Sequence, residues 1–258
     1  MSTLLRLEEV SNKQKTWEEC LPANLSDLFY YEDSDNKLKR YTNYFKLGDD
    51  AIAQIVALGA SKIDCFRIIM GCEYDADDNQ LKFAPVFSIV PVTGNATHYT
   101  LTYEPEIIET KLTFEGYIEI TSSISSLFKQ HWAELTDDQI TNAFHGTTVN
   151  KIDFKYNKPV IKLTPENAFS NKRIRNYTII HSDVEGIIKD LKSVSEEDRY
   201  IHVFLGAGLT VQLTHPFSFR PIIEVSSALA FPEDGSGPGS NYDRAKPCPP
   251  FCPNPGGG

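Results

Sequence analysis

The sequence predicts an α+β fold in which two diverged copies of a helix–strand–helix–strand–strand module form one pseudo-twofold, mixed-sheet domain with a disordered tail. Three observations predict this. Apolar residues recur at helical and strand spacings, similar residues recur in the same order further along the chain, and the composition changes abruptly after residue 231.

The bulk composition is that of a folded, acidic chain. Of 258 residues, 41% are hydrophobic and 23% charged, which suffices for a core. A net charge of −10 disfavours nucleic acid and anionic membranes as partners, because both need clustered Lys and Arg. The N-terminus has no apolar signal region, and no run approaches the length of a membrane helix. We therefore expect a cytoplasmic protein without membrane or nucleic-acid partners.

The internal repeat is a series of collinear matches. Trp17 matches Trp132 and Phe29 matches Phe144, both at an offset of 115, and Tyr41 matches Tyr156 at the same offset. After one insertion near residues 164–181 the offset rises to between 133 and 136. The later matches are Asp50 with Asp183, residues 66–71 with 201–206, and residues 83–86 with 219–222. Three further matches are Leu25 with Ile140, residues 36–38 with 150–152, and residues 45–47 with 161–163. Nine matches in one order favour a duplication.

Each copy begins with a predicted helix and a short strand. Trp, Leu or Ile, and Phe recur at i, i+8 and i+12, which places them near one helix face. In the second copy Thr136 and Gln139 have the spacing of a capping box. The strands are predicted over residues 37–45 and 151–156.

An amphipathic helix and two strands complete each copy. The helices are predicted over 49–58 and 183–191, because acidic residues open both. A strand ending at glycine follows, and then a strand containing proline, which favours a sheet edge or a bulge. These strands are predicted over 65–71 and 83–90 in copy one, and over 200–206 and 217–225 in copy two.

The remaining segments are a connection and a tail. Alternating residues around 98–103 and 112–118 predict two added strands. Seven Pro and six Gly among the last 27 residues predict a flexible tail. The predicted organisation is module copy one over 1–94, connecting strands over 95–127, module copy two over 128–231, and a Pro/Gly/Cys tail over 232–258.

No familiar catalytic motif is present, since the sequence lacks both Gly-x-Ser-x-Gly and a phosphate-binding Gly-Lys-Ser/Thr loop. One hypothesis for an enzyme remains. His202 matches Arg67 between the copies, and Arg220 and His215 lie nearby in the sequence. If these side chains converge in a cleft between the modules, Arg would hold an anionic substrate and His would transfer a proton. The alternative is that they lie on solvated sheet faces.

The tail cysteines are the second candidate site. Cys248 and Cys252 could close a small disulfide ring or supply two ligands to a metal ion, which is half of a structural zinc site. The other three cysteines, Cys20, Cys65 and Cys72, lie in apolar contexts and are expected to be buried hydrophobic residues.

These patterns resemble a set of small uncharacterised bacterial proteins. The shared features are the amphipathic helix, the strand ending at glycine over residues 66–71, the hairpin loop and the Cys-Pro-Pro-x-Cys terminus. The resemblance implies the module fold and a bacterial source, and it carries no function. This chain differs in having two copies and one tail.

The sequence favours a non-catalytic binding or assembly protein. A duplicated module gives two similar surfaces, and a self-complementary seam permits a homo-oligomer. A protein partner, bound through the module and the Cys-containing tail, is the main hypothesis. An enzyme with a cleft between the modules, and a metal- or thiol-dependent tail, are the alternatives.

Overall fold

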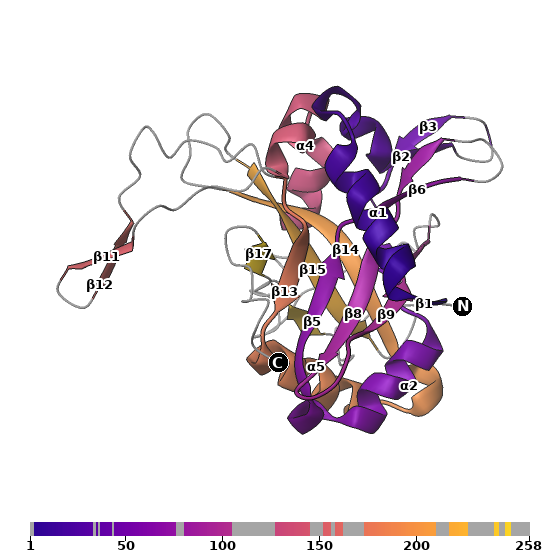
Figure 1. The fold of residues 1–258 in the computed structure, drawn as a ribbon, viewed down its shortest axis with the longest axis vertical. Helices are drawn as coiled ribbons and strands as arrows, with labels where there is room; N and C mark the ends of the chain where they lie inside the picture. The colour runs from indigo at the N-terminus through magenta and orange to yellow at the C-terminus, as the bar shows by residue number, and fades with distance from the viewer. Residues whose placement is uncertain are drawn as a thin grey trace.

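The protein has an α+β fold with two main antiparallel sheets, seen in the computed structural model (Figure 1). The structure describes residues 3–32, 35, 37–42, 44–75, 80–104, 127–144, 152–155, 158–161, 173–209, 217–226, 240–242 and 246–248.

The two sheets lie one behind the other, with β5, β8 and β13 in front of β14 and β15 in Figure 1. The larger sheet, here called the six-stranded sheet, has the order β1-β9-β8-β5-β13-β17, and the five-stranded sheet has the order β10-β4-β14-β15-β16. The six-stranded sheet comprises β1 (Leu4–Leu5), β9 (Thr97–Thr100), β8 (Val86–Pro91), β5 (Ile63–Ile69), β13 (Asn176–Ile179) and β17 (Lys246–Cys248). The five-stranded sheet comprises β10 (Thr102–Tyr103), β4 (Tyr44–Lys46), β14 (Tyr200–Leu209), β15 (Phe217–Ser226) and β16 (Ser240–Tyr242).

Each sheet combines strands from both halves of the sequence. Three consecutive strands from one half, β5, β8 and β9, are joined by β13 and β17 from the other. In the five-stranded sheet, β14, β15 and β16 are joined by β4 and β10. Apart from β1, the two sheets therefore have the same order of strands, each with two strands supplied by the opposite half.

Two helices connect the sheets and close one end of the molecule, the lower end in Figure 1. Helix α2 (Asp49–Leu58) runs from β4 to β5, and α5 (His181–Ser193) runs from β13 to β14. Both bury an apolar stripe in the core, which includes Ile52 and Ile55 of α2 and Ile187 and Ile188 of α5. The predicted mixed sheet is wrong, because each helix joins strands of different sheets and every pairing between described strands is antiparallel.

The other end of the molecule holds three helices and short turns. They are α1 (Leu7–Glu19), a helix over 127–134, α4 (Asp137–Ala143), and the 3-10 turns η1 (Pro22–Asn24) and η2 (Ser26–Phe29). The predicted continuous opening helix is interrupted in both halves, after Glu19 and at Leu135. The capping box at Thr136 and Gln139 is confirmed.

Short hairpins and turns complete the described structure. The hairpins are β2 (Tyr30–Glu32) with β3 (Leu38–Arg40), β6 (Cys72–Tyr74) with β7 (Leu81–Phe83), and β11 (Ile152–Lys155) with β12 (Lys158–Ile161), and two more 3-10 turns are η3 (Ala60–Lys62) and η5 (Glu196–Asp198). The strand predicted over 151–156 is present as β11, but it pairs only with β12 in a separate hairpin. Residues 112–118 lie outside the described residues.

Two short strands lie within the predicted tail. β16 pairs with β15, and β17 pairs with β13 through the register of Asn176 with Cys248. These two segments therefore differ from the predicted free tail, since each adds a strand to the edge of a main sheet. The rest of residues 232–258 lies outside the described residues.

An aromatic cluster at the helical end joins the two halves through contacts that recur in pairs. Trp17 lies 5.1 Å from Phe144 at an interplanar angle of 82°, and Trp132 lies 5.1 Å from Phe29 at 79°. Phe29 and Phe144 stack on each other at 5.1 Å with an interplanar angle of 1°. All four side chains are fully buried, so this cluster is the centre of the main core.

The hydrogen bonds around this cluster are also paired. The Trp17 indole donates to the Ile174 carbonyl, and the Trp132 indole donates to the Tyr41 carbonyl, both at 2.8 Å. The Tyr41 amide donates to Phe29 and the Ile174 amide to Phe144, also both at 2.8 Å. By these contacts, Ile174 occupies the position that the sequence offsets assigned to Tyr156.

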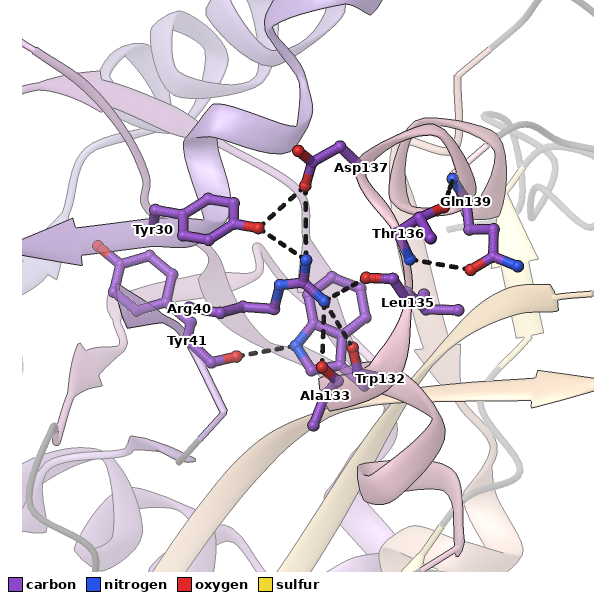
Figure 2. A network of polar contacts seen from close by, with 9 residues as sticks. All are labelled: Tyr30, Arg40, Tyr41, Trp132, Ala133, Leu135, Thr136, Asp137 and Gln139. Carbon is purple, nitrogen blue, oxygen red and sulfur yellow. Dashed lines mark hydrogen bonds and ion pairs between the residues drawn. The ribbon is translucent and has the colours of Figure 1, made fainter. Parts of the chain in front are cut away.

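Arg40 connects β3 to the helix over 127–134, as Figure 2 shows. One guanidinium nitrogen donates to the carbonyls of Trp132, Ala133 and Leu135, and the other donates to the Tyr30 hydroxyl at 2.7 Å. The last carbonyls of a helix have no partner within the helix, and a cation there also interacts favourably with the helix dipole. In the other half, Arg173 donates to the Trp17 carbonyl near the end of α1.

Candidate functional sites on the outer sheet faces

A row of polar side chains crosses the outer face of the six-stranded sheet. Phe66 and Ile68 of β5 point into the core, so Arg67 between them points outward. The register of neighbouring strands fixes the row, because directly opposed residues have their side chains on the same face. This Arg67 row consists of His98 on β9, Ser88 on β8, Arg67 on β5 and Thr178 on β13.

Two members of the Arg67 row have unused hydrogen-bonding capacity. Arg67 Nε and Thr178 Oγ1 are buried atoms with no hydrogen-bond partner. Ser88 is fully buried, and its hydroxyl lies 2.7 Å from His98 Nδ1. Unpaired buried polar atoms are costly in a folded protein, and such atoms often mark a place where a ligand completes the bonding.

Titration in this region is governed by burial and by Arg67. Burial and the nearby Arg67 guanidinium both lower the pKa of His98. Burial raises the pKa of the Cys65 thiol to about 11, although Arg67 acts in the opposite direction. At neutral pH the face therefore presents a neutral thiol, a neutral imidazole and one guanidinium.

A second polar row crosses the outer face of the five-stranded sheet. It consists of Lys46 on β4, His202 on β14 and Glu224 on β15, which are opposed in the strand registers. Lys129, from the helix over 127–134, forms an ion pair with Glu224 and lies 3.4 Å from the centre of the Phe204 ring. The negative charge of the Glu224 carboxylate is thus paired with a positive charge of the same chain.

His202 and Glu224 are almost completely buried, each with 4% of its surface exposed. The His202 ring stacks on Tyr44 with centroids 4.0 Å apart. His202 Nε2 and Glu224 Oε2 have no hydrogen-bond partner. Burial first, and then the positive charges of Lys46 and Lys129, lower the pKa of His202 to about 4.

The structure places Arg67 apart from His202 and Arg220. Arg67 lies on the outer face of one sheet, and His202 and Arg220 lie on the outer face of the other, with the core between them. His215 lies outside the described residues. Arg67 and His202 do not share a cleft, because β5 and β14 lie in different sheets whose outward faces point in opposite directions.

Arg220 fills space left by two glycines of β14. A Cβ on Gly208 would lie 2.4 Å from Arg220 Nε, and a Cβ on Gly206 would lie 2.8 Å from the Arg220 carbonyl oxygen. The Gly-Ala-Gly sequence therefore accommodates the neighbouring strand and its side chain. The Arg220 guanidinium also lies 5.7 Å from the centre of the Phe128 ring.

The tail cysteines are only partly described. The backbone of Cys248 lies in β17, and Cys252 lies outside the described residues. Within the described part of the chain, no three His, Cys, Asp or Glu side chains are grouped to hold a metal ion. A metal or thiol function of Cys248 and Cys252 stays a prediction. Cys20, Cys65 and Cys72 are free thiols, of which Cys65 and Cys72 are buried.

Sequence reasoning missed five members of the two rows, which are His98, Ser88, Thr178, Lys46 and Glu224, and it missed Lys129, which pairs with Glu224. The repeat contained a signal for two of them, because Ser88 and Glu224 are separated by the same 136 residues as Phe83 and Phe219. Thr178 and Lys129 could not be found this way, since they reach the rows from segments distant in the sequence.

Comparisons with protein-family models, curated proteins and solved structures found no match for this chain. Among the helices that the structure describes, none has the length and apolarity needed to cross a membrane.

The buried His202 makes stability depend on pH. Its pKa is about 4 when folded and is expected near 6.5 when unfolded, so the unfolded chain binds more protons between these values. Stability is present above pH 6.5 and falls by about 3 kcal/mol as the pH falls to 4. Urea unfolding at several pH values should show this dependence of the free energy of unfolding on pH. His202→Phe should reduce it by that amount. An unchanged slope in His202→Phe would contradict the assignment.

Proposed function

We propose that this chain is a non-catalytic binding protein, built from two copies of one module that exchange strands, and that it binds its partner on the outer face of the six-stranded sheet. The paired aromatic contacts and the matching strand orders support the duplication. The recurring indole-to-carbonyl bonds support it further, because each connects one copy to the other.

One observation carries the binding proposal: Arg67 is a partly exposed cation for which the described residues supply no counter-ion. A charge held partly out of water without a partner lowers stability. In the His202 row Lys129 is paired with Glu224, and the Lys46 ammonium lies over the Tyr200 ring. Retention of an unpaired Arg67 in an otherwise matching scaffold favours an external partner.

The same face argues against nucleophilic catalysis. Ser88 has the nearest hydroxyl–imidazole pair, but only 1% of its surface is exposed, so it cannot approach a substrate carbonyl. The Cys65 thiol is buried and its pKa is raised to about 11, which leaves a negligible fraction of thiolate at neutral pH. Binding needs neither group to react.

A thermal-shift screen of the full-length chain tests the proposal. The screen would use amino acids, dicarboxylates, nucleotides, sugars and short peptides at millimolar concentration. A ligand at 100 times its Kd should stabilise the fold by about 2.7 kcal/mol, seen as a raised Tm. The increase should disappear in Arg67→Ala and persist in Arg220→Ala, a matched change on the opposite face. Ligand effects that are equal in both variants, or consumption of a ligand, would contradict the proposal.

We also propose that the partner is a protein and that the chain assembles into a homo-oligomer. Native mass spectrometry of the full-length chain measures the oligomeric state, and it also reports any metal ion held by the tail cysteines. A metal-bound mass that is lost in Cys248→Ser would favour a function centred on the tail.

A further inference from the structure

We infer that the Arg67 row binds an oxyanion, a carboxylate or a phosphate group of a ligand, across β8, β5 and β13. This inference rests on the proposed binding function and adds the chemical class of the ligand. The site is centred on Arg67 and flanked by the hydroxyls of Ser88 and Thr178.

The central group determines the sign of the ligand. A guanidinium is always protonated and has only donors, arranged in a fork that matches two oxygens of a carboxylate or phosphate. Arg67 Nε is buried and has no acceptor. Asp64 is near in the sequence but exposed, and no ion pair joins it to Arg67 within the described residues.

The neighbours add donors on both sides of the guanidinium. Thr178 is directly opposite Arg67 on β13, and its hydroxyl oxygen has no partner. Ser88 is directly opposite on β8, where its hydroxyl is bonded to His98. Opposed side chains have their Cβ atoms about 5 Å apart, so an oxyanion on Arg67 would lie beside the unpaired Thr178 hydroxyl, whereas the buried Ser88 hydroxyl stays bonded to His98. Asn176, in the next row, has an unpaired side-chain oxygen that would accept a hydrogen bond from a donor on the ligand.

The five-stranded sheet provides an internal comparison. There the residue equivalent to Ser88 is Glu224, and its carboxylate binds the Lys129 ammonium. In that row the carboxylate is paired within the protein, while Lys46 and Arg220 lie over the aromatic rings of Tyr200 and Phe128. The Arg67 row has the cation and the hydroxyls but lacks the carboxylate, which is the group that an oxyanion ligand would provide.

The size of the site and the charge of the chain limit the ligand to a single oxyanion group. With one arginine in the row and a net charge of −10, extended polyanions are repelled. The ligand is therefore expected to be a small acid, a phosphorylated compound or a partner that presents one such group.

Calorimetric titration of the full-length chain with inorganic phosphate and with acetate, at ionic strength held constant with chloride, tests the inference. Binding should weaken about 10- to 100-fold in Arg67→Ala, as expected for loss of hydrogen bonds to a charged group. Arg67→Lys keeps the charge and loses the fork, so it should retain part of the affinity. Thr178→Val should weaken binding about threefold or more, and Arg220→Ala should leave it unchanged.

The outcomes distinguish a phosphorylated ligand from a carboxylate ligand, and they distinguish failure of the oxyanion site from failure of the proposed binding function. Binding of phosphate alone assigns a phosphorylated ligand, and binding of acetate alone assigns a carboxylate. If neither anion binds, or if Arg67→Ala and Arg220→Ala bind equally, the oxyanion site is overturned. If the thermal screen then finds a neutral ligand whose effect depends on Arg67, the proposed binding function stands and only the oxyanion class of ligand is rejected. If Arg67→Ala does not fold, Arg67→Lys and Thr178→Val decide the result.

Discussion

Arg40→Ala is expected to lower the free energy of unfolding by about 3–5 kcal/mol, because it removes a largely buried guanidinium that donates to several acceptors at once. The guanidinium bonds three carbonyls at the end of the helix over 127–134, and its side chain is only 13% exposed (Figure 2). Alanine would remove the Arg40 donor from all three carbonyls, of which Trp132 keeps a bond from the Leu135 amide, and the Tyr30 hydroxyl would lose one bond.

Urea unfolding of the full-length chain measures this loss. Arg40→Lys should give an intermediate result, since an ammonium cannot reproduce the fork of bonds. The matched control is Arg175→Ala, which removes a half-exposed arginine paired with Glu18 and should cost less than about 1 kcal/mol. If Arg40→Ala cost no more than Arg175→Ala, the network would not join the two halves.

The second large effect is expected at the paired tryptophans. Trp17→Ala and Trp132→Ala should each lower the free energy of unfolding by about 3–5 kcal/mol, as a buried aromatic truncation does. Both rings are fully buried, and both indoles donate to a carbonyl of the opposite half at 2.8 Å. Because the two environments match, the two losses should be similar.

Phenylalanine variants separate packing from hydrogen bonding in this pair. Trp17→Phe and Trp132→Phe keep a ring but leave the acceptor carbonyl unpaired, so a loss of about 1–3 kcal/mol is expected from each. Tyr74→Ala, at an aromatic residue with 64% exposure, is the control and should change stability by less than about 0.5 kcal/mol. A large loss at one tryptophan with none at the other would argue against equivalent halves.

Local patterns in the sequence predicted local structure well. The helix predicted over 49–58 matches α2, and the capping box at Thr136 lies where expected. These features depend on residues within a few positions of one another, such as acidic first turns and apolar i, i+4 spacing. The partners of the strands were not predictable in this way. β4 pairs with β14 across more than 150 residues, and no local spacing encodes that choice.

In the candidate site too, some features could be predicted from the sequence and others depend on how the strands pair. The repeat alignment identified Arg67 and His202 as equivalent residues, which fits their central places in the two polar rows. Their separation onto opposite outer faces depends on which sheet each strand joins. Thr178 lies opposite Arg67 only because β13 pairs with β5 in the six-stranded sheet, so the row could not be assembled from sequence spacing.

Cutting the chain once between residues 104 and 127 tests the exchange of strands between the halves most directly. The first piece then contains β4 and β10, and the second contains β13 and β17, each of which pairs in the other piece's sheet. Circular dichroism and native mass spectrometry would follow the separated and the mixed pieces. We predict that neither piece folds alone and that mixing restores a one-to-one complex with a cooperative thermal transition. A separated piece that is monomeric and melts cooperatively would contradict the exchange.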